Sequence, residues 1–165
     1  MADVKGLIIC GFPGVGKSAA SQKSRDICDC ESTPFHTIYE EVYTGKNGEA
    51  IPPTIISVKN PNWVSDYVDR IEKISSDGNA FYVLVSLHKE VRDEMDKRGL
   101  PYVIVVPEKS LKDEYLGRYV KRGNGQSFIR KVYDNWDEWL DEIESSGDPV
   151  IHLKAGEVLA DILPI

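Results

Sequence analysis

Residues 11–18 carry the spacing in this chain that is most suggestive of chemistry. They read Gly11-Phe12-Pro13-Gly14-Val15-Gly16-Lys17-Ser18 and fit the pattern G-x-x-x-x-G-K-[ST]. An apolar run precedes the motif and a helical pattern follows it, which is the context that a phosphate-binding loop requires. A glycine-rich turn with an incidental lysine is the alternative. The pattern and its context together predict a loop that binds a nucleoside triphosphate.

The chemistry of such a loop follows from its residue types. Glycines let consecutive backbone N–H groups point inward at phosphate oxygens, and the positive end of the following helix adds to the attraction. Lys17 would reach the β- and γ-phosphates, and the Ser18 hydroxyl would be a ligand of Mg²⁺. We therefore expect ATP with Mg²⁺ and a nucleotide-binding set of Gly11, Pro13, Gly14, Val15, Gly16, Lys17, Ser18 and Ala19. The loop does not identify the phosphoryl acceptor.

The elements around the loop alternate between strands and helices. Apolar runs predict strands over 4–10, 25–30, 80–85, 102–106 and 149–153, and helical spacing predicts helices over 18–24, 63–75, 88–98, 110–122, 127–145 and 156–163. Residues 31–43 are expected to be partly helical, and 44–53 to form a loop or small hairpin. Strands separated by helices favour an α/β fold with a parallel sheet.

Composition and charge restrict the class of protein. The chain has 165 residues, and 20 basic against 27 acidic side chains leave a net charge of −7. A protein that binds nucleic acid normally presents a basic surface, so we do not expect a nucleic-acid partner. With 41% hydrophobic and 28% charged residues, the chain is typical of a globular domain.

Cysteines, histidines and apolar runs point to an intracellular, metal-poor protein. The three cysteines (10, 28 and 30) and the three histidines (36, 88 and 152) do not form a metal-ligand pattern. No apolar run reaches the roughly 18 residues of a membrane span, and no cleavable signal is evident at the N-terminus. We expect reduced cysteines in a cytoplasm, which would be the host cytoplasm if a phage encodes the protein.

The loop also resembles that of a known family. The form Gly-x-Pro-Gly-x-Gly-Lys-Ser is similar to that of adenylate-kinase-like nucleoside monophosphate kinases. The rest of the chain resembles small phage-type nucleoside and deoxynucleoside monophosphate kinases, through the stretches 29–35, 60–63, 85–92 and 111–136. The resemblance implies one P-loop kinase domain over residues 1–165, with three layers and a five-stranded parallel sheet in the order 2-3-1-4-5. It also implies a short helical lid at about 108–130 and an acceptor-binding region at about 29–75.

The same resemblance implies roles for arginines. Arg118, Arg122 and Arg130 lie in or beside the lid, where they would close over the transferred phosphoryl group. Arg92 follows the third strand and would hold an acceptor phosphate. The alternatives are a solvated helix face for the lid arginines and a helical ion pair for Arg92, which is flanked by Glu90, Asp93, Glu94 and Asp96.

Residues after the second strand are candidates for binding the acceptor. Asp29, Ser32 and Phe35 are expected there, with Phe35 and Tyr39 spaced to share a helix face with Ser32. Asp29 could instead assist Mg²⁺ through water, because Ser86 stands where an aspartate would be expected after the third strand. A turn carboxylate capping the next helix is its structural alternative. We interpret His88 as a helix-start residue, and Trp63, Trp136 and Trp139 as core or near-core residues.

The function expected from these features is ATP- and Mg²⁺-dependent phosphoryl transfer to a small acceptor, foremost a nucleoside or deoxynucleoside monophosphate. Lys17, Arg92, Arg118, Arg122 and Arg130 would be its catalytic residues. Two alternatives stay open. One is an ATPase or nucleotide switch that acts on a protein partner, and the other is a kinase for a nucleic-acid end or modified base. The base, the sugar and the oligomeric state are left open by the sequence.

Overall fold

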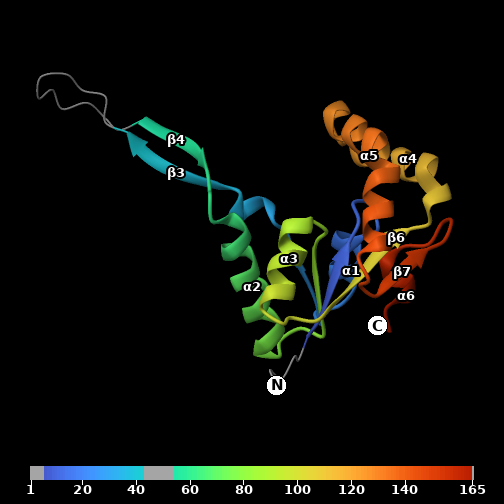
Figure 1. Cartoon of the computed structure of the whole chain (residues 1–165), viewed down its shortest axis with the longest axis horizontal. Coiled ribbons are helices and arrows are strands. Elements are labelled where there is room, and N and C mark those ends of the chain that lie inside the picture. Colours follow the sequence, from blue (N-terminus) through green and yellow to red (C-terminus); the bar gives the residue numbers. More distant parts are fainter. Residues whose placement is uncertain (1–5, 43–53, 165) are drawn as a thin grey trace, which may run out of the picture.

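The computed structural model describes residues 6–42 and 54–164. Its strands and helices alternate along most of the chain (Figure 1). In chain order they are β1 (Leu7–Gly11), α1 (Lys17–Lys23), β2 (Ile27–Cys30), the 3₁₀ turn η1 (Thr33–Phe35), β3 (Thr37–Val42), β4 (Thr54–Lys59), α2 (Trp63–Asp77), β5 (Tyr82–Ser86), α3 (Lys89–Lys97), β6 (Tyr102–Pro107), η2 (Lys109–Leu111), α4 (Lys112–Arg122), α5 (Gln126–Ser145), β7 (Val150–Leu153) and α6 (Leu159–Ile162).

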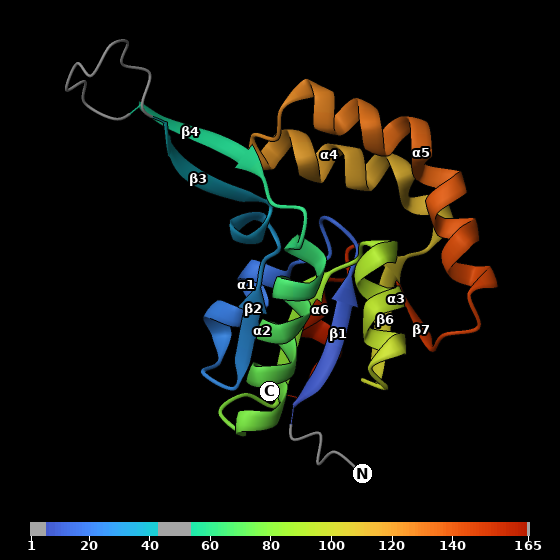
Figure 2. The same ribbon diagram turned by 60° about the vertical axis from the view of Figure 1, so that its left-hand side comes forward.

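Within the described residues, five strands form one parallel sheet flanked by helices. Helices α2 and α3 pack side by side over one face of the sheet, and α1 packs with α6 over the other (Figure 2). Because both faces are covered, the central strands β1, β5 and β6 are almost continuously apolar and buried. The structure is therefore an α/β fold.

The order of the strands across this sheet is β2-β5-β1-β6-β7. These labels differ from the predicted order 2-3-1-4-5. The labels count every strand in the chain, whereas the prediction did not include the strands β3 and β4. Counted among themselves, the five parallel strands follow the order second, third, first, fourth, fifth. The register Leu7↔Tyr82 on one side of β1 and Ile8↔Tyr102 on the other places β1 at the centre of the sheet.

Several helices are amphipathic, and two of them end at glycines. In α2 the buried side chains Tyr67, Val68, Ile71 and Ile74 recur at helical spacing. Helices α2 and α4 end at Gly78 and Gly123, which have φ values of 81° and 80° that suit residues without a Cβ atom. The predicted helices therefore exist, with ends displaced by one to a few residues from the expected positions.

The region expected to be partly helical is the main correction to the predicted secondary structure. Only the 3₁₀ turn Thr33–Phe35 is helical there, and Thr37–Val42 pairs antiparallel with Thr54–Lys59 as a two-stranded hairpin that projects from the body (Figure 1). Its strands are rich in β-branched residues, which favour extended structure. The pairing partner is distant in sequence, so local helical spacing could not reveal it. The predicted loop over 44–53 lies outside the described residues.

Among the described residues, no helix is both long enough and apolar enough to cross a lipid bilayer.

Candidate functional site

The loop after β1 has the backbone shape expected for a phosphate cradle. Gly14 and Gly16 adopt φ values of 91° and 96°, which are strained for any residue with a side chain. A Cβ atom at Gly11 would lie 2.9 Å from the Cγ2 atom of Val15 and 3.0 Å from the Cδ atom of Lys17. The three glycines of the motif are thus required by conformation or by close approach.

The inner side of the loop offers backbone donors. Within the described residues, the N–H groups of Gly14, Gly16, Lys17 and Ser18 have no protein hydrogen-bond acceptor. The last two belong to the first turn of α1, where the positive end of the helix lies. N–H groups without a protein partner at the start of a helix can bind the oxygens of a phosphate chain.

Lys17 lies across this loop. Its Nζ atom donates to the carbonyl oxygen of Gly11 at 2.9 Å. Burial lowers the pKa of Lys17, the nearby Asp29 carboxylate opposes this effect, and the positive charge of Arg122 adds to it. A phosphate beside the ammonium group would favour its charged form. Lys17, Asp29 and Arg122 therefore share one electrostatic neighbourhood.

The Ser18 side chain meets Asp29 from β2. Ser18 Oγ donates to Asp29 Oδ2 at 3.1 Å, and Asp29 Oδ1 is buried without a hydrogen-bond partner among the described residues. A hydroxyl next to a carboxylate with a spare oxygen suits Mg²⁺, which takes oxygen ligands and retains several waters. The residues present therefore fit the ion that the loop implies. No cluster of three or more His, Cys, Asp or Glu residues suited to a metal occurs in the described ranges 6–42 and 54–164.

Helix α4 packs against the glycine loop and binds its main-chain carbonyl groups. Tyr119 donates through its hydroxyl to the Pro13 carbonyl at 2.7 Å, and a Cβ atom at Gly14 would meet the Tyr119 ring at 2.9 Å. Arg118 donates to the carbonyl oxygens of Gly14 at 2.8 Å and Glu157 at 3.0 Å, and its guanidinium lies over the Tyr115 ring. The lid role expected for Arg118 stays a prediction. In this structure Arg118 binds the main chain of the loop and pairs with Glu114.

Arg92 has a carboxylate partner in this structure, and its role in holding an acceptor stays a prediction. Its side chain is buried and pairs with Glu142 of α5, with Nη2 donating to Oε1 at 2.6 Å and Nη1 to Oε2 at 3.3 Å. A bidentate pair of this kind uses the Nη1–Nη2 edge of the guanidinium group, which could otherwise bind a phosphate. In this structure Arg92 joins α3 to α5 and is not free to hold an acceptor.

The remaining predicted arginines are exposed. Arg122 donates to Asn124 Oδ1 at 3.1 Å and lies above the Tyr119 ring, and its positive charge lowers the pKa of Lys17. Arg130 lies on α5 and is 3.4 Å from Asp134. Arg122 is the predicted lid arginine that the structure brings into the electrostatic environment of Lys17.

Two of the predicted acceptor residues, Ser32 and Phe35, pack against the body of the protein, whereas Tyr39 lies on the hairpin. Ser32 is buried and accepts a hydrogen bond from the Ser86 hydroxyl at 3.2 Å. Phe35 packs against Tyr67 with ring centroids 5.3 Å apart. Tyr39 does not share a helix face with them, because it lies on β3 and is 74% exposed.

Sequence reasoning overlooked a set of rings at this edge of the sheet. His36 stacks on Trp63 at 4.1 Å, and the ring of His88 meets Trp63 at 5.4 Å and an angle of 79°. Trp63 is half-buried, as expected for a near-core residue, and it also contacts the imidazole rings of His36 and His88. The available signal was position, because Ser86 ends the third parallel strand and His88 follows it, and ligands of open α/β sheets bind at the carboxyl ends of strands.

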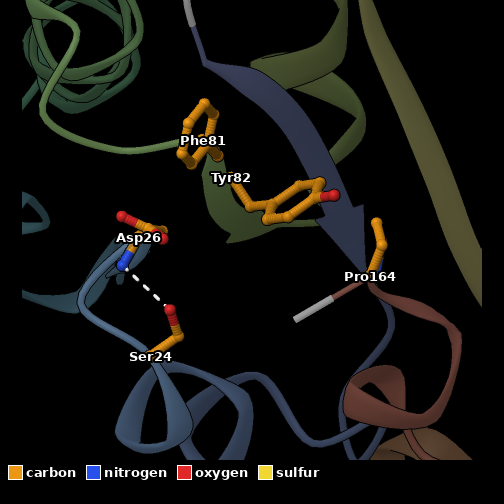
Figure 3. Close-up of a pocket in the computed structure, with 5 residues that line it drawn as sticks. All are labelled: Ser24, Asp26, Phe81, Tyr82 and Pro164. Carbon is orange, nitrogen blue, oxygen red and sulfur yellow. Dashed lines mark hydrogen bonds between the residues drawn. The ribbon is translucent and has the colours of Figure 1, made fainter.

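A pocket of a different kind lies at the opposite, amino-terminal edge of the sheet (Figure 3). Ser24, Asp26, Phe81, Tyr82 and Pro164 line it. It contains none of the loop residues, so the chemistry suggested by the motif resides elsewhere.

The fold and the loop define an α/β protein with a glycine-rich loop of the form G-x-x-x-x-G-K-S at the carboxyl edge of a parallel sheet. The structure is similar to that of the Deinococcus radiodurans tunicamycin resistance protein, with a TM-score of 0.55 and 14% sequence identity over 95% of this chain and 91% of that one. At this identity the likeness concerns the fold. No protein-family model matches the sequence, and no match was found among curated proteins.

Proposed function

We propose that the protein transfers the γ-phosphoryl group of ATP, with Mg²⁺, to a small acceptor. The observation that carries this proposal is the pairing of Ser18 with Asp29 at the mouth of a glycine loop that also holds Lys17. A hydroxyl, a carboxylate and an ammonium group around converging backbone N–H groups match the needs of a magnesium-bound triphosphate.

Each group would act in a distinct way. The loop N–H groups and Lys17 would bind the β- and γ-phosphates, and Ser18 with Asp29, directly or through water, would hold Mg²⁺. The ion would neutralise charge on the phosphate oxygens when bound. Arg122, next to Lys17, would stabilise the charge that develops on the transferred group. Arg130 would have to leave its exposed ion pair with Asp134, one turn along the same helix, before it could contribute.

The acceptor expected from the sequence is a nucleoside or deoxynucleoside monophosphate. Since Arg92 is paired with Glu142, its part in holding such an acceptor would require that pair to open. The structural neighbour is named for resistance to tunicamycin, so tunicamycin joins the set of acceptors to be tested.

The test is a coupled assay of ADP release with MgATP, run with nucleosides, their monophosphates and tunicamycin, and without an acceptor. Acceptor-dependent release is expected, and Lys17→Ala should lower it by 100-fold or more, in the range of roughly 10²–10³ for removing one electrostatic contact. Lys23→Ala, at the exposed far end of the same helix, is the matched control and should behave as the wild type. Turnover by Lys17→Ala close to that of the wild type would contradict the proposal.

A nucleotide-dependent switch with a protein partner is the second candidate. The projecting hairpin exposes the apolar side chains Tyr39 and Ile55, at 74% and 67%, which is typical of a surface that binds another protein. ADP release that needs no acceptor would favour this function. Competition by oligonucleotides would favour the third function, a kinase for nucleic-acid ends.

A further inference from the structure

The carboxyl edge of the sheet carries a second group of side chains beside the glycine loop. We define the ring cluster as His36, Trp63 and His88, which come from the end of η1, the first turn of α2 and the residue before α3. Ring centroids are 4.1 Å apart for His36 and Trp63, 5.4 Å for Trp63 and His88, and 5.9 Å for His36 and His88. Three elements that are distant in sequence thus converge on one aromatic surface.

Hydroxyl groups border the ring cluster on the side of the sheet. Ser86 Oγ donates to Ser32 Oγ at 3.2 Å, and Ser32 Oγ lies 3.5 Å from His88 Nε2. The Nε2 atom of His36 is buried and has no hydrogen-bond partner among the described residues. A buried polar atom without a partner is costly, so a ligand that supplies one would be favoured. The surface therefore combines stacking area with uncharged polar groups.

The charges around this surface distinguish it from a phosphate site. Among the described residues, no arginine or lysine forms a hydrogen bond to the ring cluster, to Ser32 or to Ser86. The charged groups that face His88 are Glu90, whose Oε1 is 3.5 Å from Nδ1, and the more distant Lys131 and Lys17. Lys17 belongs to the loop, which leaves Lys131 as the cation that an acceptor phosphate would use.

We propose that the ring cluster with Ser32 and Ser86 binds the acceptor, that the acceptor is an uncharged ring-bearing alcohol such as a nucleoside, and that His88 removes the proton from its reacting hydroxyl. This inference rests on the proposed phosphoryl transfer and names its acceptor class. The hydroxyl oxygen forms a bond to the γ-phosphorus while the bond from that phosphorus to the β–γ bridging oxygen breaks. The electron pair leaves with ADP, and the hydroxyl proton moves to His88 Nε2.

The environment of His88 suits this role. Burial lowers its pKa, His36, Lys131 and Lys17 lower it further, and Glu90 opposes them. The imidazole is therefore neutral at neutral pH and able to accept a proton. As pH falls through this lowered pKa, His88 becomes protonated and kcat/KM should fall with it.

The experiment compares nucleosides with their own monophosphates as acceptors for MgATP and identifies the products by ³¹P NMR. A phosphate monoester formed from the nucleoside is expected, rather than a phosphoanhydride formed from the monophosphate. His88→Ala should lower kcat by about 100-fold, as for the loss of a general base, and added imidazole should restore part of it. Trp63→Ala should raise the acceptor KM by about 10-fold, the effect of one lost stacking contact.

His152→Ala and Lys131→Ala are the controls. His152 lies on β7 and pairs with Glu144, so its removal should leave turnover and the pH profile unchanged. The inference is overturned if phosphoanhydride is the product and Lys131→Ala raises the KM of the monophosphate, or if His88→Ala turns over nucleosides normally. Those results would leave the phosphoryl transfer itself intact. Failure of the wild type to bind MgATP, measured by calorimetry, would instead remove the proposed function and this inference together.

Discussion

A single carboxylate determines how the candidate metal site is completed. Ser86 occupies the strand end where an aspartate was expected, and Asp29 of β2 lies within hydrogen-bond distance of Ser18 instead. This is possible because α1 packs against β2, which brings the first turn of the helix next to the end of that strand. The carboxylate that the third strand lacks is thereby supplied by the second.

At the residue scale, we predict that Asp29→Asn weakens the dependence on magnesium. The amide keeps a hydrogen-bond acceptor for Ser18 but loses the negative charge, so the Mg²⁺ concentration for half-maximal activity should rise by about 10-fold or more. A magnesium titration of ADP release at saturating ATP measures this. Asp26→Asn, at the opposite edge of the sheet, is the control. An unchanged magnesium requirement would assign Asp29 to the acceptor or to structure alone.

At the scale of elements, α4 and the glycine loop form one packed unit. Tyr115, Arg118 and Tyr119 contact the loop from the same side of the helix, through a ring edge, a guanidinium group and a hydroxyl. The expected lid region therefore includes a helix that holds the loop in shape. Arg122, one turn further on, remains exposed near Lys17.

This packing leads to a prediction about Gly14. Gly14→Ala places a methyl group 2.9 Å from the Tyr119 ring at a positive φ, and should lower the free energy of unfolding by about 1–3 kcal/mol. Gly117→Ala, in the middle of α4 with open space around its Cβ position, should instead raise it by about 0.5–1 kcal/mol. Urea unfolding followed by circular dichroism measures both. Equal stability of the two variants would mean that the loop does not rest on α4 in solution.

On the scale of the whole molecule, the ion pair of the buried Arg92 with the partly exposed Glu142 joins α3 to α5 across 50 residues of sequence. The pair lies between α3, which packs on the sheet, and α5, whose apolar stripe includes the buried Trp136 and Leu140. The indole of Trp136 also donates to the Lys109 carbonyl at 2.9 Å. Arg92 thus helps to hold the C-terminal helices against the sheet.

We predict that Arg92→Met destabilises the protein more than it impairs acceptor use. Removing one partner of a buried ion pair costs roughly 3–5 kcal/mol, and the loss here should be at or below the lower end because the Glu142 side chain is 34% exposed. The double variant Arg92→Met/Glu142→Met should recover part of the loss. Urea unfolding gives the stabilities, and the acceptor KM should stay within twofold in the folded protein. A normal unfolding midpoint with a greatly raised KM would return Arg92 to the acceptor site.

Local sequence patterns determined much of the architecture. The buried runs of β5 and β6, the apolar stripes of α2 and α5, and the glycine-lysine motif are all local features, because burial on both faces, helical periodicity and loop conformation each leave a short-range pattern. For the same reason the elements alternated as expected and implied a parallel sheet. The strands β3 and β4 were not predicted, since a loop or small hairpin was expected only over 44–53 and Thr37 pairs with Lys59, too far along the chain for a local period to reveal.

Side-chain partners were decided by the tertiary structure alone. The sequence by itself could name Asp29 as a candidate from its place near a strand end, and Arg92 and Arg118 from the resemblance to nucleoside monophosphate kinases. Whether each one meets a hydroxyl, a carboxylate or a main-chain carbonyl depends on which distant element packs beside it. The convergence of His36, Trp63 and His88 likewise arises from packing between separate elements. Sequence spacing thus determined the elements and the loop, and tertiary packing decided which side chains meet around it.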